Sequence, residues 1–120
     1  MKLENIYKKE PASLEAAHGG EGTLIFREIL TDEFKTALNF LHYTILPPKT
    51  SIGFHLHSDT EEVYIVLEGK GTIMVNDMEK AVGKGDVILA NPGDSHGLIN
   101  DSESNLEILV FECSKHQTGR

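Results

Sequence analysis

Turn-forming residues interrupt this chain about every ten positions, and that spacing limits the fold more than any other feature of the sequence. The short segments between the turns are rich in β-branched and aromatic residues, which favour strands. No helix of useful length fits between them, so an antiparallel sandwich or barrel is expected, and the fold class is all-β. The expected strands are residues 23–30, 37–46, 52–57, 62–67, 72–75, 80–82, 86–90, 97–99 and 106–113.

The first 22 residues lack this pattern. Ala12 to Ala17 is expected to form one helical turn, and a glycine-rich stretch follows it at residues 18–22. A chain of 120 residues is close to the commonest size of one domain. The sequence therefore predicts an irregular lead-in over residues 1–22 and a single β-barrel domain over residues 23–120.

Charge and composition exclude several classes of partner. Nineteen acidic and eleven basic residues give a net charge of −8, which opposes binding to nucleic acid. No apolar run approaches the length of a membrane span or a signal peptide, so no membrane partner and a cytoplasmic location are expected. The single cysteine, Cys113, is expected to be a small apolar residue at the end of a strand.

Three histidines and one glutamate form the constellation that carries chemistry. His55 and His57 are two residues apart on an expected strand, so both imidazoles lie on one face. A turn then leads to Glu62 at the start of the next strand, and His96 opens another strand further along. Three imidazole nitrogens and one carboxylate oxygen suit a divalent transition-metal ion (Mn, Fe, Ni, Co, Cu or Zn) better than Ca or Mg.

The spacing of these residues resembles the two motifs of the cupin superfamily. The first motif is matched by Gly53, His55, His57, Glu62 and Gly69. The second is matched by Gly85, Asp86, Gly93, His96 and Asn100, after the short intermotif stretch seen in small bacterial cupins of the oxalate decarboxylase-like type. Two positions depart from the pattern: Lys49 replaces the leading glycine of the first motif, and Asn91 replaces the first proline of the second.

The resemblance implies a double-stranded β-helix, or jelly roll, with one metal ion inside the barrel. It assigns the four metal ligands to His55, His57, Glu62 and His96. Glu61 is one residue out of phase with the motif and is expected to face solvent. The remaining histidines, His18, His42 and His116, have no such support.

Strand alternation extends the site beyond the ligands. Residues expected to line the cavity are Gly53, Val66, Leu98 and Asn100, with Gly53 leaving space beside the metal. Tyr64 shares a face with Glu62 and is a candidate for a polar contact or a proton transfer, although it can equally be a ring that fills the barrel. His42 and Tyr43 are further catalytic candidates, but they face opposite ways and the sequence does not show which one faces inward.

These features predict a metal-dependent enzyme acting on a small oxyacid or sugar-derived metabolite. Four protein ligands on an octahedral ion leave two adjacent positions, which suit a substrate that binds through two oxygens. Decarboxylase, dioxygenase, lyase and isomerase reactions all remain open, because a fold does not choose among them. The alternative is a non-catalytic module that binds metal and a small molecule. A homodimer is expected, because a lone barrel would expose an unpaired edge at a long first strand such as residues 37–46 or 23–30.

Overall fold

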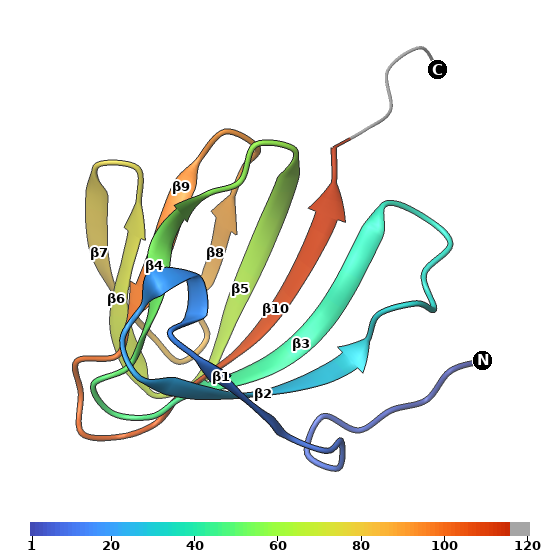
Figure 1. Cartoon of the computed structure of the whole chain (residues 1–120), viewed down its shortest axis with the longest axis horizontal. Coiled ribbons are helices and arrows are strands. Elements are labelled where there is room, and N and C mark those ends of the chain that lie inside the picture. Colours follow the sequence, from blue (N-terminus) through green and yellow to red (C-terminus); the bar gives the residue numbers. More distant parts are fainter. Residues whose placement is uncertain (116–120) are drawn as a thin grey trace.

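Two antiparallel sheets face each other and form a jelly roll (Figure 1). The computed structural model describes residues 1–115. The larger sheet has the strand order β1 (Ala12–Glu15), β2 (Thr23–Leu30), β3 (Leu38–Leu46), β10 (Leu106–Ser114), β5 (Thr60–Glu68) and β8 (Val87–Ala90). The smaller sheet has the order β4 (Ser51–Leu56), β9 (Ser95–Ile99), β6 (Lys70–Val75) and β7 (Met78–Gly83). The all-β jelly-roll prediction is confirmed, and each expected strand is present with ends that differ by at most two residues.

The amino-terminal segment differs from the expectation. Residues 12–15 form strand β1, which pairs with β2, and not the start of a helical turn. Helical geometry is confined to the 3₁₀ turn η1 (Ala17–Gly19). The free edge of β2 supplies hydrogen-bond partners that a single isolated helical turn does not have, so the strand is favoured. Within residues 1–115, no helix is long and apolar enough to cross a membrane.

The core lies between the inner faces of the two sheets. Val66 on β5 and Leu98 on β9, both predicted to line the cavity, are almost completely buried in this core. Phe40 on β3 packs against the same cluster from its edge. Strand alternation explains the pattern, because every second residue of these strands points inward. The other buried apolar members are Ala17, Leu24, Leu46, Ile52, Tyr64, Ile73, Val82, Leu106, Ile108 and Val110.

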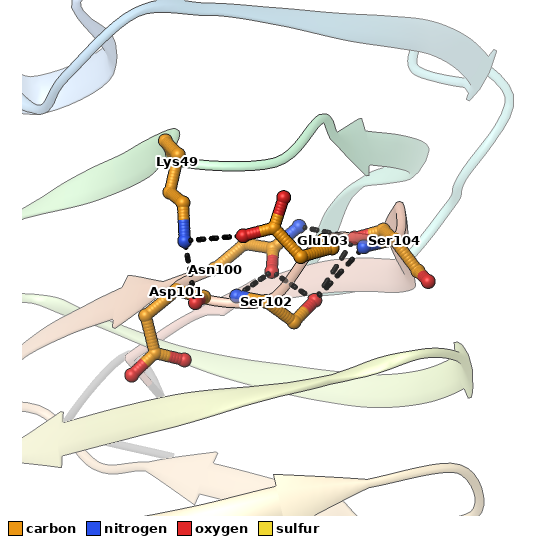
Figure 2. A network of polar contacts seen from close by, with 6 residues as sticks. All are labelled: Lys49, Asn100, Asp101, Ser102, Glu103 and Ser104. Carbon is orange, nitrogen blue, oxygen red and sulfur yellow. Dashed lines mark hydrogen bonds and ion pairs between the residues drawn. The ribbon is translucent and has the colours of Figure 1, made fainter.

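A second polar cluster lies at the lower end of the barrel in Figure 1, in the loop between β9 and β10. Asn100 is completely buried there, and its amide nitrogen donates to the carbonyl oxygens of Leu46 and Ser104, both at 2.8 Å. Its amide oxygen accepts from the backbone N–H and the hydroxyl of Ser102, at 3.0 and 2.7 Å (Figure 2). Asn100 therefore holds this loop in place through hydrogen bonds. It does not line the cavity around the histidines, contrary to the prediction from the sequence.

Lys49 shows why the cupin pattern has a glycine at this position. Its backbone φ is +66°, in the left-handed region that residues with a Cβ rarely adopt. The lysine side chain reaches the β9–β10 loop, where its ammonium group lies 3.0 Å from a carboxylate oxygen of Glu103 and donates to the carbonyl of Asp101 (Figure 2). The departure from the pattern thus affects the end of the barrel that lacks the histidines.

Candidate metal centre

The β4–β5 and β8–β9 connections lie at the upper end of the barrel in Figure 1. The four predicted ligands lie in or near these connections and converge there. His55 is paired in register with His96 across β4 and β9, while His57 follows the end of β4 and Glu62 lies near the start of β5. One ligand atom from each side chain lies within 4.8 Å of those of the other three. Residues far apart in the sequence therefore form one cluster with metal-ligand chemistry.

Hydrogen bonds at Nδ1 fix how two of the imidazoles face the cluster. His55 Nδ1 lies 2.6 Å from the carbonyl oxygen of Gly53, and a carbonyl can only accept, so this nitrogen carries the proton. His57 Nδ1 lies 2.9 Å from the hydroxyl of Thr60. The Nε2 atoms of the two rings are 2.8 Å apart. His55 Nε2 therefore carries no proton and presents its lone pair to the cluster, where it can bind a cation.

His96 gives the clearest sign of a missing partner. Its side chain is 1% exposed, and Nε2 is buried without a hydrogen bond, although Glu62 Oε1 lies 3.0 Å away. A buried nitrogen without a hydrogen bond is costly for a fold, and few are retained unless something else satisfies them. The donor set of three imidazoles and one carboxylate fits a divalent transition metal, so these residues can hold such an ion.

The charge states at neutral pH also suit a metal. Burial lowers the pKa of His55 to about 4, and the rings of His18, His96 and His57 add to the effect. Burial alone would raise the pKa of Glu62, but the neighbouring imidazoles, His96 first, outweigh it and lower that pKa. A neutral His55 and an ionised Glu62 are therefore present without any change of protonation on metal binding.

A carboxylate that the sequence reasoning missed lies near His57 on the Nδ1 side of its ring. Glu112 is paired in register with Glu62, and one of its oxygens lies 3.6 Å from His57 Nδ1. Asn39 donates to the other oxygen of Glu112 at 3.2 Å and accepts from Ser114 at 3.0 Å. Such partners orient a ligating imidazole and raise its basicity. The sequence did contain a signal for Glu112: it is an acidic residue at the same alternation as the inward-facing Ile108 and Val110.

Tyr64 is the next inward-facing residue after Glu62 on β5 and lies deeper in the barrel. It is 3% exposed, and its ring centroid is 5.2 Å from that of His96. Burial, followed by the charge of Glu62 and a hydrogen bond to it, raises the pKa of the Tyr64 hydroxyl well above its ordinary value. Tyr64 therefore stays protonated at neutral pH and is not available as a base.

His42 and Tyr43 lie on opposite faces of β3, and the structure decides which faces inward. His42 shares the inner face with Phe40, on which its ring stacks at 4.1 Å, and burial is the main cause of its lowered pKa. Tyr43 faces away from the histidine cluster, where its hydroxyl donates to Glu107 and its ring lies under the guanidinium of Arg27. Of these two residues, only His42 therefore lies on the face of β3 that points toward the histidine cluster.

Gly53 does not leave open space beside the cluster. A Cβ at this position would collide with the carbonyl oxygen of His18, because η1 packs directly on β4. This turn places the His18 ring parallel to the His55 ring, with centroids 3.6 Å apart. Sequence reasoning gave His18 no role, since only tertiary packing brings it to the site. His116 lies outside the described residues.

An all-β jelly roll that holds three imidazoles and one carboxylate in its barrel defines a class of barrel proteins with a cluster that could hold a metal ion. Residues 42–112 match the family described as "Cupin domain", which covers more than half of the chain. The chain therefore belongs to the cupin family, as its two motifs indicate.

Three relatives extend this likeness over nearly the whole chain. An "Oxalate-binding protein" of Thermotoga maritima is 29% identical over 101 residues, covering 83% of this chain and 84% of the relative. An uncharacterized protein of Methanocaldococcus jannaschii is 33% identical over 114 residues, covering 95% and 90%. The crystal structure of a predicted oxalate decarboxylase from Thermotoga maritima is 25% identical, with a TM-score of 0.91, and covers 94% of this chain and 99% of that one.

Proposed function

We propose that this cupin binds one divalent transition-metal ion through His55, His57, Glu62 and His96, and that the loaded site binds a small oxyacid through two oxygens. The observation that carries the proposal is the buried Nε2 of His96, which has no hydrogen bond although it faces the other three ligands. When bound, the ion would polarise the oxygens of the oxyacid as a Lewis acid.

The charges around the site restrict the ligand further. The charged neighbours that shift the pKa values of His42, His55 and Glu62 are other histidines and glutamates, with no lysine or arginine among them. The negative charge of an oxyacid is then balanced mainly by the ion, which favours compact ligands that contact it through two oxygens. Oxalate is the first candidate, since two relatives are named for it.

We further propose that the site is catalytic. Polar groups that are not ligands lie beside it: Tyr64 stays protonated, while the lowered pKa of His42 keeps its imidazole neutral and able to accept a proton. Decarboxylase, dioxygenase, lyase and isomerase reactions are all compatible with this set of side chains. The second candidate is a binding module that does not turn over its ligand, which the name of the "Oxalate-binding protein" favours.

Binding and product analysis together test both candidates. Oxalate and other small two-oxygen ligands should raise the melting temperature of the Mn- or Co-loaded protein. The rise should disappear after chelation and in a Glu62→Ala variant. Product analysis under air and under nitrogen then separates an oxygen-dependent reaction from an oxygen-independent one, and saturable binding without product supports the binding module. Stabilisation by long apolar compounds alone would overturn the substrate class.

We also propose that the chain forms a homodimer. Strands β2 and β3, where the free edge was expected, are each paired on both sides. A free edge of the larger sheet is instead β8, whose side chains Val87 and Leu89 are 64% and 51% exposed. An edge strand with exposed apolar residues is prone to pair with another chain. Light scattering at micromolar concentration should give twice the 13.3 kDa mass of the chain, and a strictly monomeric mass would refute this proposal.

A further inference from the structure

His18 packs on one of the proposed metal ligands although it does not belong to the cluster of four. Its ring is 3.6 Å from that of His55, with only 8° between the planes, and 6.4 Å from that of His57. We propose that His18 is a positioning residue that holds His55 in the orientation required for metal binding. This inference rests on the metal site proposed above.

The contacts of the His55 ring restrict different motions. Its hydrogen bond to Gly53 fixes which nitrogen faces the cluster, and its Nε2 lies 2.8 Å from Nε2 of His57. Both contacts are made at ring nitrogens, so the ring can still tilt about the line through those two atoms. A second flat ring against the face of His55 opposes the tilt, because the tilted ring would collide with it. His57 and His96 meet His55 edge to face, at 65° and 74°, so among these three rings only His18 lies flat against it.

The backbone fixes His18 over this position. Ser51 donates from its N–H to the carbonyl of Glu21 at 3.0 Å, and its hydroxyl accepts from the N–H of Glu21 at 2.9 Å. Gly53 lacks the Cβ that would collide with the His18 carbonyl oxygen. Ala17, the residue before His18 in the same turn, is 4% exposed and belongs to the core. The turn is therefore docked on β4, and the stacked ring follows from that docking.

The turn also keeps an unfavourable backbone conformation. Ala16 and His18 have φ values of +51° and +50°, in the left-handed region that residues with a Cβ rarely occupy. Such residues persist where surrounding contacts hold them, and they cluster at functional sites. Residue 18 lies outside segment 42–112, so the match to the family does not include this contact.

Three variants test the inference through cobalt binding. His18→Ala removes the flat ring, while His18→Phe keeps a flat ring without nitrogen atoms. Glu15→Ala, on an exposed residue of β1, is the matched control. Cobalt affinity, measured by competition with a chelator, should fall about tenfold in His18→Ala, as for other groups that orient a ligand. The visible spectrum of bound cobalt should change in the same variant. His18→Phe and Glu15→Ala should both resemble the wild type.

A second measurement uses the metal-free protein, so that the two proposals can fail separately. The ring signals of His55 in nitrogen–proton NMR spectra should move and broaden in His18→Ala and return to sharp lines in His18→Phe. Unchanged signals and unchanged cobalt affinity in His18→Ala would overturn the positioning role. A His18→Phe variant that behaves like His18→Ala would also overturn it, because the nitrogens would then be the active part. A wild-type protein that binds no cobalt, yet shows the NMR pattern, would refute the metal site while supporting the positioning of His55.

Discussion

The two polar clusters at opposite ends of the barrel differ in how their buried groups are satisfied. His96 and Asn100 are only four residues apart in the sequence, and their side chains are both almost completely buried. Asn100 takes part in four hydrogen bonds with Leu46, Ser102 and Ser104. His96 Nε2 has none, and it faces two further Nε2 atoms that are 2.8 Å apart. Burial alone therefore does not identify a site, whereas an unsatisfied group in a cluster of ligands does.

The difference also explains what each end contributes. A network in which every polar atom has a partner stabilises the fold and needs no ligand. A cluster that leaves nitrogens unpaired reduces stability until a cation completes it, so its stability becomes coupled to metal binding. Substitutions at the two ends should therefore affect different measurements.

Removal of one ligand should give the largest effect. His96→Ala leaves three of the four ligand groups, and metal affinity should fall by more than about 100-fold, because even the outer partners of a metal ligand contribute 10- to 100-fold. The metal-free protein should also lose stability, by about 2–4 kcal/mol, because truncation of this fully buried ring leaves a cavity. Competition titration and thermal unfolding of the metal-free protein measure the two quantities. Affinity within threefold of wild type would contradict the assignment of His96 as a ligand.

At the other end, stability should fall without a loss of metal affinity. Asn100→Ala leaves the carbonyl oxygens of Leu46 and Ser104 without their donor. The free energy of unfolding should fall by about 2–6 kcal/mol, the range for losing four hydrogen bonds at about 0.5–1.5 kcal/mol each. Metal affinity, measured well below the unfolding temperature, should remain that of wild type. A selective loss of metal affinity with unchanged stability would show that the clusters are not independent.

Acid should separate the two ends, because the lowered pKa of His55 makes the histidine end, and not the Asn100 end, sensitive to pH. The pKa of His55 is about 4 in the folded protein and near 6.5 when the chain is unfolded. Between these values the unfolded state binds more protons, so the stability of the metal-free protein should fall as pH drops from about 6.5 to about 4 and this contribution should then level off. Chemical denaturation at several pH values measures it, with His55→Gln as the control. An identical pH profile in the control would contradict the assignment to His55.

The smallest effect tests the two faces of β3. Tyr43→Phe removes the hydrogen bond to Glu107 on the face away from the histidine cluster. The free energy of unfolding should fall by about 1 kcal/mol, with no change in metal or oxyacid binding. Calorimetry on the loaded and metal-free variant measures both. A loss of oxyacid binding would place Tyr43 in the functional site after all.

The sequence was most informative where function depends on strand periodicity. His55 and His57 share a face because side chains alternate, and the turn to Glu62 returns the chain to the same place. The same rule left β3 ambiguous, since alternation shows that His42 and Tyr43 face opposite ways but not which faces the core. That choice depends on what covers each face, and the outer face is covered by Tyr7 and Arg27 from distant parts of the chain.

Other features could not be predicted from local pattern at all. β1 forms because an edge of β2 is available, and His18 reaches His55 because η1 docks on a glycine of β4. Asn100 fits its motif position, but its role depends on a loop that folds back over it. These contacts join segments through tertiary packing, for which a single sequence contains no periodic signal.

Metal content tests the central claim most directly. The protein is purified without chelator, supplied with Mn, Fe, Co, Ni, Cu and Zn in turn, and analysed for bound metal after removal of the excess, beside the His96→Ala variant. The proposed metal site predicts close to one ion per chain in the wild type and almost none in the variant. A folded wild-type protein that retains none of these metals, or a variant that retains as much as the wild type, would contradict it.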